Sequence, residues 1–80
     1  MSEHKESELP LSLAHGEVLY LDGGGSIRWE SNGEAKDVFF GDSFERDTEI
    51  FPGNEYEYVY QGRTFRLKAD FGDDLLIEKV

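Results

Sequence analysis

The side chains that most often carry acid–base or nucleophilic chemistry are scarce in this chain of 80 residues. It contains two histidines, His4 and His15, and no cysteine. Without cysteine there is no thiol nucleophile, no disulfide scaffold and no thiolate zinc site. Neither histidine has a serine at a spacing that suggests a catalytic triad. We therefore expect that the protein is not an enzyme.

Two groups of carboxylates have the chemistry to hold a hard cation such as Ca²⁺. The first group is Asp42, Glu45 and Asp47, and the second is Asp70, Asp73 and Asp74. Neither group follows the D-x-[DN]-x-[DN]-G pattern of a calcium-binding loop. The sequence therefore predicts solvated turns at both places, with no metal ion and no cofactor.

Three consecutive glycines at residues 23–25 have the composition of a phosphate-binding loop. Such a loop leads into the N-terminus of a helix, whose backbone N–H groups hold the phosphate. A strand-like run follows the glycines here, so the sequence predicts a tight or bulged β-turn at this point.

Short runs rich in β-branched and aromatic residues predict the elements that position these groups. They cover residues 17–21, 26–30, 37–40, 55–60, 64–71 and 75–80. Turn signals such as Asn32-Gly33 and Gln61-Gly62 separate them. The pattern predicts an all-β fold, a small antiparallel barrel of five to six strands over residues 15–80. Residues 1–14 are expected to form a flexible acidic N-terminal arm.

Alternation along the expected strands predicts which side chains face the core. Ile27 and Trp29 share one face of their strand, and Arg28 lies on the other. In the next strand, Phe39 points away from the face of its two neighbours. The tyrosines of residues 55–60 share one face and are expected to pack in the core with their hydroxyls at its rim.

The formal net charge is −10, from 18 acidic and 8 basic residues. An excess of this size repels phosphate and anionic membranes, and it suits solubility, high salt or a basic partner. No apolar run approaches the roughly 20 residues that span a bilayer, and residues 1–15 do not read as a signal peptide. We expect a soluble cytoplasmic protein that does not associate with membranes.

Residues 16–60 resemble a cold-shock domain, over three successive motifs in residues 16–43 and, in residues 53–60, over the family's fourth strand, G-x-x-V-x-F-x-V, with tyrosines at the apolar positions. The first strand of that family reads G-x-V-x-W-F-N, the second begins K-G-x-G-F-I, and the third reads D-V-F-V-H-F-S. The matching positions here are Gly16, Val18, Tyr20, Leu21 and Asp22, then Gly23, Gly25 and Ile27, and then Asp37, Val38, Phe39, Phe40 and Ser43.

The resemblance implies a five-stranded OB-like barrel that binds single-stranded DNA or RNA. Bases would stack on Tyr20 and Phe39, and Arg28 would offer a cation to the phosphates. The family's second-strand phenylalanines fall on glycine and serine here, and its third-strand histidine falls on glycine. Residues 63–80 hold two expected strands where the family has one, so an SH3-like barrel is the alternative fold.

The alternative function is an acidic protein-interaction module or inhibitor that engages a basic, nucleic-acid-binding partner. Its candidate contacts lie in the longest connection and are Asp42, Phe44, Glu45, Asp47 and Glu49. If Phe39, Phe44 and Phe51 are all exposed, they form an apolar patch of the kind that marks an interaction site.

Overall fold

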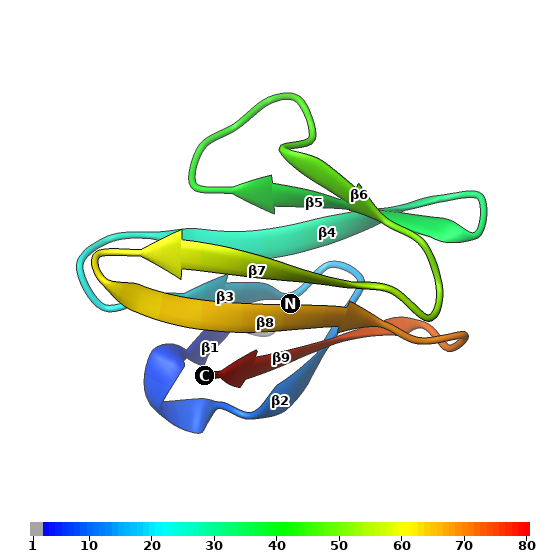
Figure 1. Ribbon diagram of the computed structural model, residues 1–80. Coiled ribbons are helices and arrows are strands. Elements are labelled where there is room, and N and C mark those ends of the chain that lie inside the picture. The colour runs from blue at the N-terminus through cyan, green and yellow to red at the C-terminus, as the bar shows by residue number, and fades with distance from the viewer. Residues whose placement is uncertain (1–2) are drawn as a thin grey trace.

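Two β-sheets make up the fold (Figure 1), and the computed structural model describes residues 3–80. The first sheet has the order β1-β3-β4-β5-β6, with β1 at Glu3–Lys5, β3 at Val18–Tyr20, β4 at Ser26–Asn32, β5 at Ala35–Phe40 and β6 at Thr48–Ile50. The second has the order β2-β9-β8-β7, with β2 at Leu11–Ala14, β9 at Asp74–Lys79, β8 at Arg63–Ala69 and β7 at Glu55–Tyr60.

The all-β class is confirmed. Residues 3–80 form nine strands rather than five or six, and over this range no ladder joins the sheets into a closed barrel.

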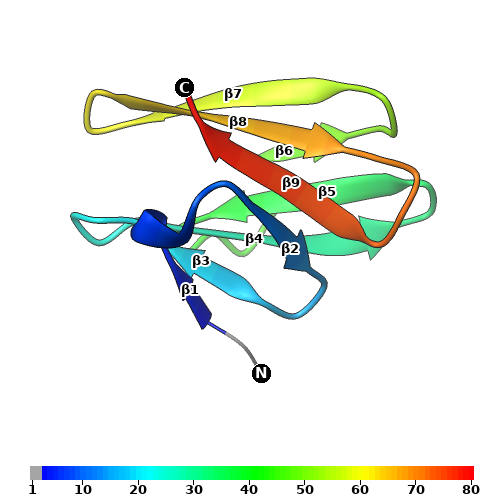
Figure 2. The same ribbon diagram turned by 90° about the horizontal axis from the view of Figure 1, so that it is seen from below.

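The apolar core lies between the sheets, and Figure 2 shows β7, β8 and β9 on one side and β3, β4 and β5 on the other. Its members include Leu13, Leu19, Ile27, Trp29, Val38, Phe65, Leu67, Leu75 and Ile77. The inward face predicted for Ile27 and Trp29 is confirmed, since both are buried. The indole Nε1 of Trp29 donates a hydrogen bond of 2.7 Å to the carbonyl of Leu13, which satisfies its buried polar atom.

The hairpin of β7 and β8 turns at Gln61 and Gly62, as the sequence predicts. Both residues have positive φ, 50° and 76°, which is the pattern of a type I′ turn. A turn of this type matches the twist of the two strands and therefore sets their register. The register carries the tyrosine face of β7 over the core, where Tyr58 and Tyr60 pack against it.

The hairpin of β4 and β5 pairs Asn32 with Ala35, so Gly33 is the first central residue of its turn and not the second. Gly33 has φ of 63°, the left-handed region that glycine enters without steric cost. This register places Arg28 directly opposite Phe39 on the outer face of the sheet. Because of this pairing, the Arg28 side chain lies over the Phe39 ring.

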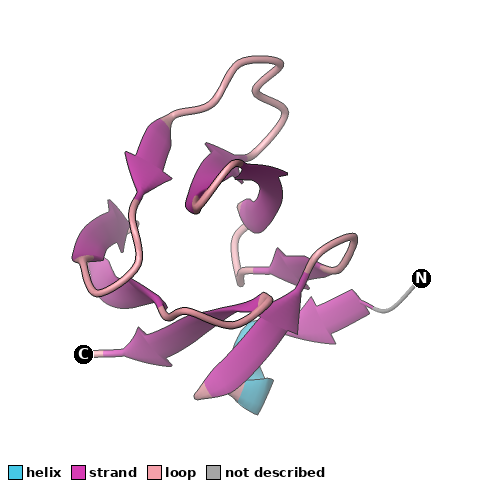
Figure 3. Cartoon of the chain, turned by 90° about the vertical axis from the view of Figure 1, so that its right-hand side faces the viewer, coloured by secondary structure: helices cyan, strands magenta, loops and turns pink. Residues whose placement is uncertain are grey.

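The N-terminal segment belongs to both sheets, which corrects the expectation of a flexible acidic arm over residues 1–14. Residues 1 and 2 lie outside the described residues. β1 pairs in parallel with β3, and β2 pairs antiparallel with β9. Between them, the 3-10 turn η1 (Glu6–Glu8), visible beside the strands in Figure 3, buries Glu6. Backbone pairing and the buried Glu6 carboxylate hold β1 and η1, whereas Leu13 in the core, with Leu9 and Leu11 packed against it, also holds β2.

The triple glycine forms the predicted tight turn between β3 and β4. The N–H of Leu21 donates to the carbonyl of Gly25 at 2.8 Å, and the N–H of Gly24 donates to the carbonyl of Leu21 at 3.2 Å. The Tyr60 ring lies against this turn, and its hydroxyl donates to the carbonyl of Gly23 at 3.0 Å. The glycines therefore allow a close approach between the two sheets as well as the turn itself.

We expect Gly25→Ala to lower the free energy of unfolding by about 2 kcal/mol through overpacking. A Cβ at Gly25 would lie 2.8 Å from Cζ of Tyr60 and 3.0 Å from both Cε atoms. Urea unfolding measures the loss. In a Tyr60→Ala background the same glycine substitution should cost little. An undiminished cost there would mean that the Tyr60 ring is not the cause.

Candidate interaction surface

The three residues expected to bind nucleic acid do not form an open stacking face. Tyr20 on β3 is 46% exposed, whereas Phe39 on β5 is only 8% exposed. The guanidinium of Arg28 lies over the Phe39 ring, with Cζ 4.2 Å from its centroid. Arg28 also donates to the carbonyl of Ser43 at 2.9 Å and to the carboxylate of Glu30 at 3.3 Å. The expected exposure of Phe39 is therefore wrong, because a cation from the neighbouring strand covers its ring.

The loop between β5 and β6 is fixed by hydrogen bonds at both ends and in its middle. At its start, the N–H of Gly41 donates to the carbonyl of Ser26 at 2.9 Å. At its end, the N–H of Asp47 donates to the carbonyl of Val38 at 2.8 Å, and the Asp47 carboxylate accepts from the N–H of Phe40 at 2.8 Å. Together with the bond from Arg28 to Ser43, these contacts order a loop that carries no secondary structure.

Phe44 stands at the middle of this loop and is 99% exposed. Asp42 and Glu45 lie on either side of it and are also exposed. Within residues 3–80, neither carboxylate makes a hydrogen bond or an ion pair. The loop thus presents one bare aromatic ring between two unpaired negative charges. Phe51, the third phenylalanine of the expected patch, is half exposed in the connection from β6 to β7.

The remaining two candidate carboxylates, Asp47 and Glu49, serve the loop itself. The Arg46 guanidinium lies 3.2 Å from the Asp37 carboxylate and 2.9 Å from the Glu49 carboxylate. The hydrogen bond with Asp37, and the negative charges of Glu49 and Asp37, raise the pKa of Arg46 above its usual value. Sequence reasoning missed Arg46, because its partners come from β5 and β6 and are set by the sheet register.

A stack of aromatic rings lies beneath the loop, where β5 ends. The Phe40 and Tyr58 rings are parallel within 2°, with centroids 3.8 Å apart, and the Tyr56 centroid lies 6.1 Å from that of Phe40. Burial raises the pKa of Tyr58, with smaller contributions from the charges of Tyr60, Asp47 and Tyr56. The rings join the two sheets at the end of β5, where the loop begins.

The described part of the chain contains no group of three or more histidine, aspartate or glutamate side chains arranged to hold a metal ion. Nor does any helix in residues 3–80 have the length and apolarity to cross a membrane. Comparisons of the chain with protein-family models, with curated proteins and with solved structures found no match, so its resemblance to cold-shock domains stays a prediction.

Proposed function

We propose that this protein is an acidic protein-interaction module that engages a basic partner through the loop between β5 and β6. The observation that carries the proposal is Phe44, a large apolar side chain that is 99% exposed on a loop fixed by backbone hydrogen bonds. An exposed phenylalanine contributes nothing to the core. A ring held out in this way is suited to fill a pocket on another protein.

The energetics of such a contact favour a fixed loop. Burying a phenylalanine side chain contributes about 1.5–3 kcal/mol. Ordering a flexible loop on binding would offset much of that gain, at about 0.5–1.5 kcal/mol for each side chain that is immobilised. Because hydrogen bonds from Arg28 and to the carbonyls of Ser26 and Val38 already order the loop, most of the burial energy remains for association.

The charge indicates the chemistry of the partner. The chain carries a net charge of −10. Asp42 and Glu45 lie on either side of Phe44, and neither makes a hydrogen bond or an ion pair among the described residues. A basic surface around the receiving pocket would gain from both carboxylates and from faster, electrostatically steered association. We propose a nucleic-acid-binding protein as the partner, since such proteins carry basic surfaces. A cytoplasmic location belongs to the same proposal and suits a chain without cysteine.

Single-stranded nucleic acid is the competing ligand, and the geometry favours it less. Stacking needs exposed rings beside a positive rim. Here the Phe39 ring is covered, and Arg28 is already engaged with Ser43 and Glu30. Of the two rings predicted to stack on bases, Tyr20 and Phe39, only Tyr20 is exposed.

Phe44→Ala is expected to weaken binding to a basic partner by roughly 10- to 100-fold while leaving stability unchanged. The assay titrates the protein against a panel of purified basic nucleic-acid-binding proteins at low and moderate salt. Phe51→Ala is the matched control, since it removes a half-exposed ring outside the loop. The double substitution Asp42→Asn and Glu45→Gln should make the affinity for the basic partner less dependent on salt concentration.

Two outcomes would contradict the proposal. One is that Phe44→Ala binds every member of the panel as well as the wild-type protein. The other is tighter binding to a labelled single-stranded oligonucleotide than to any protein, with loss of that binding in Tyr20→Ala. The second result would support the cold-shock resemblance instead.

A further inference from the structure

A cavity of about 260 Å³ opens at the end of β5 opposite the Phe44 loop. Phe44 follows the C-terminal end of that strand, whereas Ala35 and Lys36 at its N-terminal end line the cavity. Figure 1 shows the loop between β5 and β6 on one side of the molecule and the turn between β8 and β9 on the other. The cavity is therefore separate from the surface described above.

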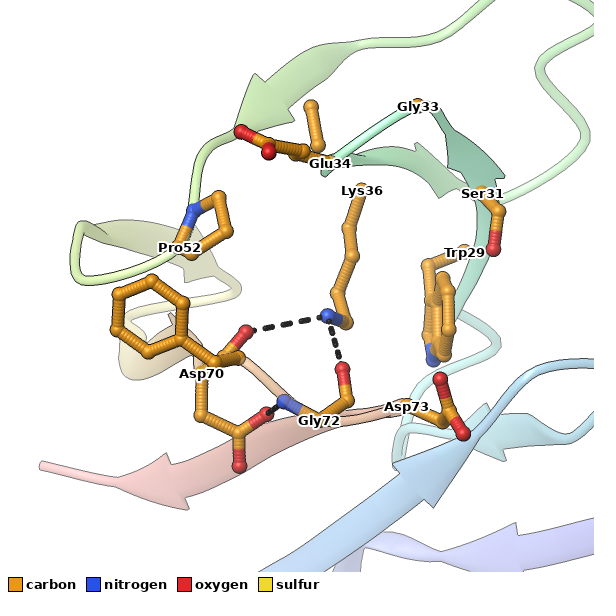
Figure 4. A pocket seen from close by; sticks show the side chains of 11 residues that line it. Trp29, Ser31, Gly33, Glu34, Lys36, Pro52, Asp70, Gly72 and Asp73 are labelled. Carbon is orange, nitrogen blue, oxygen red and sulfur yellow. Dashed lines mark hydrogen bonds between the residues drawn. The ribbon is translucent and has the colours of Figure 1, made fainter.

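Lys36 forms the inner wall of this cavity and is only 4% exposed. Its Nζ donates to the carbonyls of Gly72 at 3.0 Å and Asp70 at 3.5 Å, and lies 5.1 Å from the centroid of the Trp29 ring (Figure 4). These contacts direct its charge toward the backbone of the turn between β8 and β9. The Asp70 carboxylate accepts a further bond of 2.9 Å from the N–H of Gly72, which tightens the same turn.

The turn that Lys36 fixes carries Phe71, which lines the cavity and is 90% exposed. Pro52 and Trp29 supply further apolar surface to the wall. This is the second place in the described chain where an almost fully exposed phenylalanine stands on a hydrogen-bonded turn beside carboxylates. The face of a phenylalanine ring attracts a cation that lies over it.

Carboxylates outnumber cations around the cavity. Glu34, Asp70 and Asp73 line it, against the single ammonium of Lys36. Glu34 and Asp73 are exposed, and within residues 3–80 they make no hydrogen bond or ion pair. An anionic ligand would meet three negative charges before it reached a buried ammonium whose donors are engaged. A cationic ligand would meet free carboxylates and an aromatic ring.

We infer that this cavity receives an arginine side chain. A planar guanidinium can stack on the Phe71 ring and pair with the Glu34 or Asp73 carboxylate at the same time, which the compact ammonium of lysine does less well. Its aliphatic stem would pack along Pro52. The inference rests on the proposed function to the extent that the arginine belongs to the basic partner, which would then contact both ends of the sheet.

Trp29 gives a direct measurement, because it is the only tryptophan in the chain and lines the cavity. Its fluorescence is followed while acetyl-Gly-Arg-Gly-amide is added to the full chain at low salt. We expect a saturable change with a dissociation constant in the millimolar range. The same peptide with citrulline in place of arginine, which keeps the shape and removes the charge, should give no saturation. Phe71→Ala and Asp73→Asn should each weaken binding by about fivefold.

Phe44→Ala should leave binding of the arginine peptide unchanged, which separates this inference from the proposed function. If Phe44→Ala has no effect on basic proteins but the peptide still saturates, the Phe44 surface fails and the arginine cavity stands. Equal binding of the citrulline peptide, or no saturation with either peptide, would overturn the inference. Saturation by acetate that disappears in Lys36→Met would also overturn it and identify an anion site.

Discussion

Glu6→Gln is expected to lower the free energy of unfolding by about 3 kcal/mol, the typical cost of breaking a buried ion pair from one side. The Glu6 carboxylate is buried and lies 2.9 Å from Nε of Arg63 and 2.8 Å from Nζ of Lys79. It also accepts from Nη2 of Arg63 at 3.1 Å and from the N–H of Asp22 at 2.9 Å. Glutamine would keep the shape but leave both cations without a counter-charge and turn an N–H₂ toward them.

Thermal unfolding measures this loss, which for a domain of this size corresponds to more than about 10 °C in Tm. Glu3→Gln is the matched control, because it removes a carboxylate from the same segment at an exposed position. It should leave Tm nearly unchanged. Equal effects of the two substitutions would show that the buried contacts of Glu6 contribute nothing beyond general charge.

The hairpins and the inward faces are the part of the fold that the sequence predicts well. Alternation of apolar residues has a direct physical cause, since successive side chains on a strand point to opposite faces. Ile27 and Trp29 are buried for this reason. The Gln61-Gly62 turn could be predicted from Gly62, because glycine accepts positive φ without steric cost; the positive φ of Gln61 could not, because glutamine is not a residue type that favours it.

The polar part of the N-terminal segment, β1 and η1, could not be predicted in this way. β1 contains Glu3, His4 and Lys5 and is held by parallel backbone pairing to β3, which needs no apolar side chain. The partners of Glu6 lie 57 and 73 positions away along the chain, at Arg63 and Lys79. No local pattern in a polar stretch indicates contacts at such separations.

The candidate site was predicted in part. The sequence identified Phe44 and its neighbouring carboxylates by residue type and by their place in a long connection. It did not distinguish Asp42 and Glu45, which are unpaired in the described chain, from Asp47 and Glu49, which hold the loop. It also placed Arg28 and Phe39 on one outer face without showing that the first covers the second. Both distinctions depend on the register across β4, β5 and β6.

Acid should remove the stabilising contribution of Glu6 in a defined pH window. The hydrogen bond to Lys79, with those from the N–H of Asp22 and from Arg63, lowers the pKa of Glu6 from 4.5 to about 2. A carboxyl whose pKa is lower in the folded state stabilises that state above its unfolded pKa. The contribution is therefore complete above about pH 5, declines as the pH falls through 4.5, and is lost near pH 2.

The stability of the wild-type protein alone does not isolate this effect. Protonation of the other carboxylates takes the net charge from −10 at pH 7 to zero at the isoelectric point near 4.4 and to positive values below it, so charge repulsion also changes stability where Glu6 titrates. The difference between wild type and Glu6→Gln removes that common part, because both proteins carry the other carboxylates. Urea unfolding at pH 6, 4.5, 3.5 and 2.5 and constant ionic strength should give a difference of about 3 kcal/mol at pH 6 that shrinks steadily below pH 4.5. A difference that stays constant down to pH 2.5 would mean that the pKa of Glu6 is the same in the folded and unfolded states, and that its contacts with Arg63 and Lys79 do not favour the charged carboxylate.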